Sequence, residues 1–361
     1  MTPRLRFLIK LAVAAGLLAA APLVLSDFRL QLLAKFLCLA MVGVGIGLAW
    51  GQGGMLTMGQ GVFFGLGGYI MAMHLKLADA GPGGVPDFML LYGTGEVPWW
   101  WEPMRDPFVT LVLIVAVPGL FAAILGAGVF IRRVRGAYFA ILSQTLVAAF
   151  AILLVGQQQT TGGTNGLNGF RSFFGYDLAD PTNHQMLYFI CAGVLVGMVL
   201  LVRQLMASRF GELLIAVRDE ENRVRFLGYD PARVKILTFV LAAVFAAIGG
   251  ALFVPVVGII SPSDVGVVAS IGFIVGVAIG GRATILGPAL GSIAVSLAKT
   301  SLSESFPSAW TYFQAALFIV VIALLPQGLA SLADGARLLW ARKLVRKAEP
   351  VPPVLTEGGS A

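Results

Sequence analysis

Long apolar runs separated by short polar stretches dominate the chain. Most of these runs approach or exceed about 18 residues, the length that a helix needs to cross the hydrocarbon core of a membrane. We therefore predict ten membrane-spanning helices. The ninth is short for a crossing, so we expect it to be tilted or partly re-entrant. The predicted ranges are 5–25, 30–49, 60–78, 107–131, 136–156, 185–205, 233–256, 264–281, 286–300 and 310–329.

The composition agrees with this pattern and excludes an ordinary soluble protein. Of the 361 residues, 58% are hydrophobic and only 12% are charged, whereas soluble domains are roughly 45–50% apolar. The mean hydropathy is +0.89. The predicted fold class is all-α, a single polytopic membrane helix bundle.

Basic residues orient the bundle, because positively charged short loops stay on the cytoplasmic side. In this arrangement 19 of the 25 basic residues fall on one side, and ten spans place both termini there (N-in/C-in). The opposite, outer side carries the acidic loops 79–106 and 157–184 and the stretch "VPWWWEP" at 97–103, which we expect to be an interfacial anchor. The 19 residues are Arg4, Arg6, Lys10, Arg132, Arg133, Arg135, Arg203, Arg209, Arg218, Arg223, Arg225, Arg233, Lys235, Arg282, Arg337, Arg342, Lys343, Arg346 and Lys347.

The chain divides into three parts. Residues 1–29 form an N-terminal span that is either retained or signal-like, and we favour a retained helix because no clear small-x-small cleavage site precedes Asp27. Residues 30–335 form the bundle. Residues 336–361 are predicted to be a basic, disordered cytoplasmic tail.

The stretch "GQGGMLTMGQGVFFGLGGY", residues 51–69, interrupts the hydrophobic pattern with eight glycines. Glycines at 43, 47 and 51, and again at 61 and 65, have the spacing that lets helices approach closely. Two interpretations stay open. The stretch serves close packing alone, or Gln52, Thr57 and Gln60 also line a path for an uncharged, hydrogen-bonding solute beside an interrupted helix.

A second polar stretch, "GQQQTTGGTNGLNGF" at 156–170, lies at the outer end of the fifth predicted span. Clusters of glycine, asparagine and threonine usually mark solvated turns. The position of this cluster also predicts contact with a solute that arrives from outside, through Thr160, Thr161 and Asn165.

The segment 208–235, "SRFGELLIAVRDEENRVRFLGYDPARVK", is the only long charged stretch between spans on the inner side. Four apolar residues fall near one face at helical spacing, with Glu220 interrupting the stripe. Gly228 can end this helix, and Asp230-Pro231 marks the turn before the next span. Mixed charges favour a protein groove over an anionic membrane as its partner. The apolar residues are Leu213, Val217, Val224 and Leu227.

No catalytic or metal-binding constellation is evident. The chain has no Gly-Lys pair and hence no phosphate-binding P-loop. Its two histidines and its two cysteines, both in apolar runs, predict no metal site, cofactor or disulfide, and its scattered basic residues predict no nucleic-acid partner. We interpret Lys35 and Lys299 as snorkelling side chains near outer helix ends, and Arg282 as an orientation charge.

The chain resembles the permeases of ATP-binding-cassette importers, particularly the branched-chain amino-acid permease family. The resemblance covers most of residues 40–330 in the family order. Within that family, "PWWWEP" and "AKTSLSESFPSAW" (298–310) resemble the urea and short-chain amide branch, in its partner-type subunit with the longer N-terminal region. The shared motifs are "GGMLTMGQGVFFGLGGY", "RRVRGAYFAILSQT" (132–145), "TGGTNGL" (161–167), the segment 208–231, "SPSD" (261–264) and "GGRATILGPALG" (280–291).

This resemblance implies a multi-pass permease subunit of a bacterial inner membrane, without catalytic residues of its own. It implies a heterodimer with a second permease subunit, two cytoplasmic ATP-binding subunits and an external solute-binding protein. The expected activity is import of urea or short-chain amides by alternating access. The alternatives are import of leucine-like amino acids and a passive small-solute channel. The residues expected to couple to the ATPases are Glu212, Arg218, Asp219, Glu220, Glu221 and Gly228.

Overall fold

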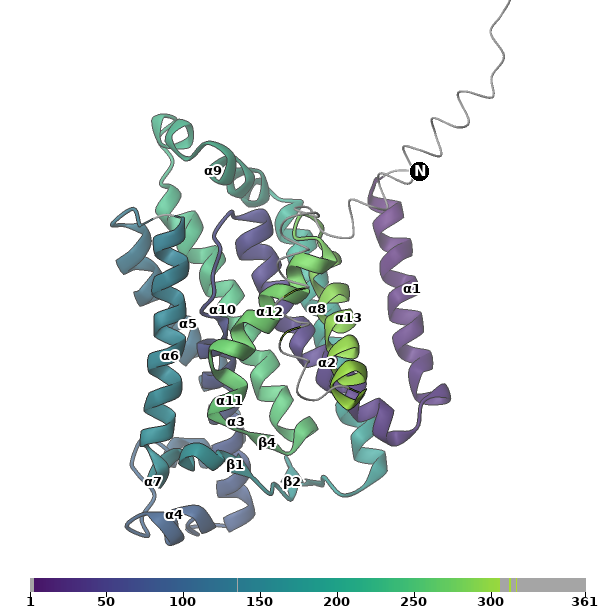
Figure 1. The fold of residues 1–361 in the computed structure, drawn as a ribbon, viewed down its shortest axis with the longest axis vertical. Coiled ribbons are helices and arrows are strands. Elements are labelled where there is room, and N and C mark those ends of the chain that lie inside the picture. Colours follow the sequence, from purple (N-terminus) through teal and green to yellow (C-terminus); the bar gives the residue numbers. More distant parts are fainter. Residues whose placement is uncertain (1–2, 135, 306–311, 313–315, 317–361) are drawn as a thin grey trace, which may run out of the picture.

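The computed structural model describes residues 3–134, 136–305, 312 and 316, and within them the chain forms a bundle of long helices (Figure 1). Seven helices of the described part are long and apolar enough to cross a membrane. They are α1 (Pro3–Val24), α2 (Asp27–Ile46) with its π-helical extension η1 (Gly47–Gln52), α3 (Gln60–Ala80), α5 (Pro107–Phe130), α6 (Ala137–Gly156), α8 (Pro181–Met206) and α10 (Pro231–Val257).

Shorter elements join and cap these helices. The helical ones are α4 (Asp87–Tyr92), η2 (Glu102–Arg105), α7 (Gln158–Thr161), η3 (Gly163–Asn165), α9 (Arg209–Phe226), α11 (Pro262–Val265), α12 (Val267–Gly280) and α13 (Gly287–Ser305). Two small antiparallel pairs complete the described part. β1 (Leu167–Asn168) pairs with β4 (Ile259–Ile260), and β2 (Ser172–Phe173) pairs with β3 (Tyr176–Asp177).

The predicted helix bundle is confirmed, with one correction to its shorter spans. The eighth predicted span, 264–281, is divided into α11 and the 14-residue α12, so it is the short element. The ninth, expected to be short, forms the 19-residue α13. The tail 336–361 and almost all of the tenth span lie outside the described residues.

Three long helices begin with the same local signal. Asp106, Asp180 and Asp230 each precede a proline, and each carboxylate accepts a hydrogen bond from a backbone N–H in the first turn of α5, α8 or α10. Proline fits the first helical position because its missing N–H would have no partner there. The aspartate satisfies one of the free amides. These dipeptides fix where three long helices start.

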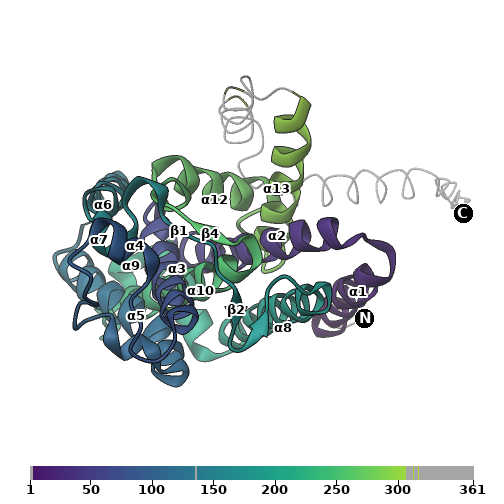
Figure 2. The ribbon, with the colours of Figure 1, turned by 90° about the horizontal axis from the view of Figure 1, so that it is seen from below.

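Helices α2, α3 and α10 form the centre of the bundle, and glycine allows α3 and α10 to touch backbone to backbone (Figure 2). Gly67 of α3 lies against the carbonyl of Ala247, and Gly250 of α10 lies against the carbonyl of Phe64. A side chain at either glycine would overlap the opposite backbone. We call this reciprocal contact the α3–α10 seam.

The predicted glycine stripe on the second span is also confirmed as a packing surface. Gly43 and Gly47 lie against Pro288 at the start of α13, and Gly51 lies against the carbonyl of Arg282. Small residues let these backbones approach closely where a side chain would separate them.

The first helix, α1, begins at the end of the bundle where α9 lies (Figure 1). This agrees with the charge pattern, which assigns both segments to the cytoplasmic side. The Tyr188 hydroxyl of α8 donates a hydrogen bond to the Leu18 carbonyl at 2.8 Å, which ties α1 to the bundle. Retention of this helix in the mature protein stays a prediction.

Candidate functional site

The chain loses regular helical structure between η1 and α3, over residues 53–59, which we call the inner break. Gln52 precedes it, is 8% exposed, and donates from Nε2 to the carbonyl of Ala283 at 3.1 Å. The inner break also touches α6, because the Ser143 hydroxyl accepts a hydrogen bond from the Met58 N–H at 3.0 Å. Its backbone is thus held by surrounding protein, as irregular backbone inside a bundle must be.

Thr57 and Gln60 lie in and just after the inner break, and both are buried. The Thr57 hydroxyl accepts a hydrogen bond from the Gly59 N–H at 3.3 Å. The Gln60 side chain is 1% exposed, and neither its Nε2 nor its Oε1 has a hydrogen-bond partner in the described structure. A buried amide without a partner costs about 1–3 kcal/mol. Gln60 is therefore available to a bound solute or to another state of the bundle.

A second interruption, the outer break, covers residues 258–266 between α10 and α12. Gly258 ends α10 in the left-handed conformation with φ 78°, and strand β4 follows. Ser261 and Asp264 then cap α11 reciprocally. The Asp264 Oδ2 atom accepts hydrogen bonds from the Ser261 N–H at 3.0 Å and from its hydroxyl at 2.7 Å.

The predicted outer polar loop is tied to the outer break. Gly166 lies against the carbonyl of Ile260, and β1 pairs with β4 immediately after it. The Thr161 hydroxyl is buried and donates to the Leu154 and Gln157 carbonyls at 3.0 and 2.9 Å. The loop residues therefore hold the end of α6 and position the outer break.

The six predicted pathway residues form two groups. Gln52, Thr57 and Gln60 follow the inner break, whereas Thr160, Thr161 and Asn165 lie around α7 and η3, at the end of the bundle opposite α9 (Figure 1). Thr160 is half-buried and its hydroxyl lies 3.4 Å from the Gln157 carbonyl, and Asn165 is exposed. Contact of these groups with a solute stays a prediction.

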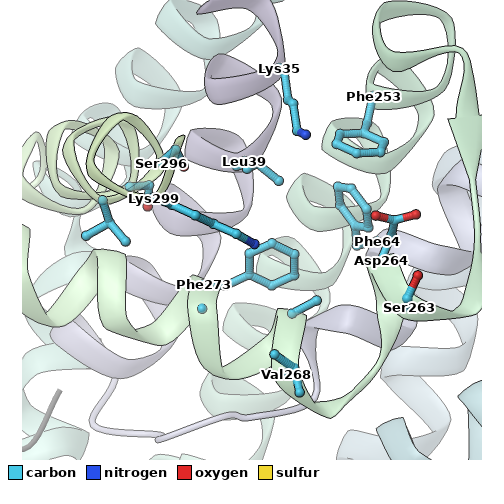
Figure 3. A pocket seen from close by; sticks show the side chains of 14 residues that line it. Lys35, Leu39, Phe64, Phe253, Ser263, Asp264, Val268, Phe273, Ser296 and Lys299 are labelled. Atoms are coloured by element: carbon cyan, nitrogen blue, oxygen red, sulfur yellow. The ribbon is translucent and has the colours of Figure 1, made fainter. Parts of the chain in front are cut away.

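A cavity of about 180 Å³ lies beside the outer break and contains charged groups that the sequence analysis did not assign to a site. Lys35 of α2 and Lys299 of α13 line it together with Asp264 (Figure 3). Phe64, Phe253, Phe273 and Leu39 supply apolar walls. The available sequence signal was the position of both lysines inside apolar helices, where charge is costly and usually functional.

Helix α9 is amphipathic, as predicted, with two differences in its buried face. Leu214 is fully buried where the stripe predicted Leu213, and Leu227 is 71% exposed. Leu227 lies just past the end of α9 at Phe226, and within the helix Glu220 introduces a kink, because its φ of −145° and ψ of 71° are not helical. Val217 and Val224 are buried on either side of the kink, as predicted.

Arg218 joins α9 to the inner break. Its Nη1 donates to the Gly51 carbonyl at 3.1 Å, and its side chain lies beside Gly54. Its Nε forms an ion pair with Asp219 at 2.8 Å. The hydrogen bond from Arg218 lowers the pKa of the Asp219 carboxyl, so this carboxylate stays charged at neutral pH.

The remaining predicted coupling residues differ in their surroundings. Glu221 faces α10, where it forms ion pairs with Lys235 at 2.7 Å and with Arg225 at 3.2 Å. Glu212 and Glu220 are exposed. Gly228, with φ 88°, follows the end of α9 as predicted. Three exposed apolar side chains gather at that end, namely Phe226, Leu227 and Tyr229.

The described part is a long-helix bundle with two interrupted helices and one amphipathic helix at one end, an arrangement that fits a membrane transport subunit. Residues 28–325 match the family model described as "Branched-chain amino acid transport system / permease component". The chain belongs to this family of ABC importer permeases. It is therefore a multi-pass protein of the bacterial inner membrane and a transport subunit rather than an enzyme.

Two relatives are named as permeases of branched-chain amino acid transport systems. The chain is 25% identical to the high-affinity branched-chain amino acid transport system permease protein LivM of Escherichia coli K12, covering 90% of this chain and 74% of LivM. It is 22% identical to the permease protein LivH of the same strain, covering 80% of this chain and 90% of LivH. No solved structure matches the chain.

Proposed function

We propose that this chain is the permease subunit of an ATP-driven importer for leucine-like amino acids. The coupled mechanism is supported by α9, which contacts the inner break at one point and exposes apolar side chains at its far end. Its Arg218 contacts the Gly51 carbonyl, while its far end exposes Phe226, Leu227 and Tyr229. A partner bound to that exposed end can thereby shift the inner break.

The proposed partners follow from this arrangement and from the relatives. Two ATP-binding subunits supply the hydrolysis, because this sequence contains no P-loop. A second permease subunit completes the translocation unit, as LivM and LivH are both named as permeases of one transport system. A solute-binding protein delivers the amino acid to the outer loops.

The proposed mechanism is alternating access. Closure of the ATPase subunits moves α9 and changes the relative stability of outward-facing and inward-facing bundles. Solute and nucleotide influence each other because each binds one of these states preferentially. The inner break, with Thr57 and Gln60, forms the cytoplasmic part of the path.

The substrate assignment rests on the relatives, whose names specify branched-chain amino acids. Urea and short-chain amides, expected from the resemblance of "PWWWEP" (98–103) and "AKTSLSESFPSAW" (298–310) to that branch of the family, form the alternative substrate class. Similarity to LivM and LivH supports the amino acid over these neutral solutes.

Uptake by the reconstituted complex tests the proposal. Proteoliposomes that contain both permeases and both ATPase subunits are supplied with binding protein and with labelled leucine, urea or acetamide, with and without internal ATP. We expect ATP-dependent uptake of leucine. Urea uptake without leucine uptake would reject the substrate, and uptake that does not need ATP would reject the importer in favour of a channel.

A further inference from the structure

The cavity beside the outer break combines two cations, one anion and an apolar wall. Lys35 and Lys299 enter from α2 and α13, and Asp264 lies across from them on α11 (Figure 3). About 180 Å³ of space lies between them, far more than the roughly 10–15 Å³ that one water molecule needs. The cavity therefore has room for a small organic solute.

The two lysines face one acidic group, Asp264, across the cavity. Neither takes part in a salt bridge among these residues, and the Lys35 ammonium instead lies 5.8 Å from the centre of the Phe253 ring. Lys35 is half-buried and sits about 12 Å along α2 from its outer start, at 1.5 Å per residue. A charge at this depth inside a membrane helix is costly and usually serves transport.

The cap of α11 fixes the position of the Asp264 carboxylate beside the cavity. Its Oδ2 receives both hydrogen bonds from Ser261, whereas no hydrogen bond to Oδ1 is present among the described residues. The capping of α11 thus uses one carboxylate oxygen and leaves the other available. Capping alone does not explain why two ammonium groups line the same cavity.

We propose that this cavity is the membrane binding site for a zwitterionic amino acid with an apolar side chain. Lys35 and Lys299 bind its carboxylate, Asp264 binds its ammonium, and Phe64, Phe253 and Phe273 contact its side chain. This assignment rests on the proposed import of leucine-like amino acids and adds where and how the permease itself holds them. Urea has no charges for these groups to bind. An anionic lipid without an ammonium group would leave Asp264 without a cation to bind.

The first test removes the charges in the full reconstituted complex. We expect Lys35→Gln and Lys299→Gln to lower leucine uptake at least about tenfold, about 1.4 kcal/mol, because each variant loses a charged hydrogen bond to the carboxylate. The matched control is Lys76→Gln. Lys76 is also half-buried near an outer helix end and also lies over a phenylalanine, Phe170, at 5.9 Å, but it does not line the cavity. We expect normal uptake from this variant.

A second variant guards against loss of folding. Lys299→Cys allows charge to be restored chemically. Its thiolate attacks the sulfenyl sulfur of aminoethyl methanethiosulfonate, which forms a disulfide to the aminoethylthio group and breaks the bond to the sulfonyl sulfur, releasing methanesulfinate. The natural Cys38 and Cys191 are fully buried and shielded from the reagent. We expect the cationic aminoethyl group to restore uptake and a sulfonatoethyl group of opposite charge to leave it low. Leucine should slow the modification, and urea should not.

The outcomes separate the two proposals. Leucine uptake at the wild-type rate by both Lys→Gln variants would overturn the cavity assignment and leave leucine import standing. Uptake of urea alone by the wild type would instead reject leucine import itself. If the variants equal the wild type in purely zwitterionic liposomes and fall behind only when phosphatidylglycerol is added, the lysines hold an anionic lipid and the assignment is overturned.

Discussion

The inner and outer breaks both interrupt a helical crossing, but their surroundings differ. The inner break is closely packed. Gly53 and Gly54 touch Leu214 and Arg218 of α9, and Gly51 beside it lies against the Arg282 backbone. The outer break borders an open cavity and is held by a short strand pair and by the cap of α11.

This difference indicates a division of labour between the two breaks. A closely packed break transmits displacement, because packed elements shift between discrete arrangements rather than deforming continuously. A break that borders a cavity leaves polar groups available to a ligand. We therefore interpret the inner break as the mechanical link to α9 and the outer break as part of the solute site.

The largest expected effect is steric and compares equivalent changes near each break. Gly51→Ala places a Cβ into the Arg282 carbonyl, whereas Gly266→Ala meets its nearest atom, the Pro262 carbonyl oxygen, at 3.3 Å. Overpacking costs roughly 1–3 kcal/mol and more where backbone must move, so we expect Gly51→Ala to remove most of the folded protein and Gly266→Ala to keep it. Thermal unfolding of the purified complex measures this. Equal melting temperatures would contradict the packing difference.

The next effect concerns coupling. Arg218→Gln removes the hydrogen bond to the Gly51 carbonyl, so we expect leucine uptake to fall about tenfold for a lost charged hydrogen bond while ATP hydrolysis continues. Arg223→Gln is the control on the same helix, at an exposed position. Uptake per ATP hydrolysed is the measurement. An equal loss of uptake per ATP in both variants would show that the net charge of α9 matters, and that the Arg218 contact does not.

A smaller effect is expected at Gln60, where transport and stability should move in opposite directions. Gln60→Leu removes a buried amide without a partner, so we expect the free energy of unfolding to rise by about 1 kcal/mol. Uptake should nevertheless fall several-fold if the amide contacts the solute. The exposed Gln159→Leu serves as control. Unchanged uptake in Gln60→Leu would contradict contact between the Gln60 amide and the solute, and would leave the inner break with a packing role alone.

The smallest effect concerns pH. Arg218 lowers the pKa of Asp219 below its ordinary value of 3.8, so this ion pair favours the folded state above that value and is lost only as pH falls through the lowered pKa. We therefore expect the ratio of wild-type to Asp219→Asn uptake to stay constant between about pH 5 and 8. Asp219 is exposed and its ion pair is solvated, so the ratio itself should be close to one. A ratio that changes across this range would contradict the pKa direction.

Much of the fold was predictable because bilayer crossing imposes a strong periodic signal. The predicted start of α5 at 107 and the end of α6 at 156 agree with the structure, and the Asp-Pro dipeptides mark helix starts. The two-part eighth span was missed because its apolar run continues through Gly266, whose extended backbone divides α11 from α12. The kink at Glu220 was also missed, because the interruption of the apolar stripe was the only sign of it in the sequence.

The cavity could not be predicted, because its charges come from three separate segments. Lys35, Asp264 and Lys299 are distant in sequence, and each has an ordinary local explanation as a snorkelling side chain or a helix cap. Cys38 and Cys191 illustrate the same limit. Their sulfur atoms lie 3.6 Å apart as free thiols, although 153 residues separate them.

The α3–α10 seam has a consequence for how this sequence can vary. Because Gly67 and Gly250 each face the other helix's backbone, no compensating change in a neighbouring side chain can make room for a larger residue. A larger residue at either position would require α3 and α10 to move apart along their contact. Sequence drift is therefore constrained jointly at these two glycines and is freer on the lipid-facing surfaces, such as the outward face of α5.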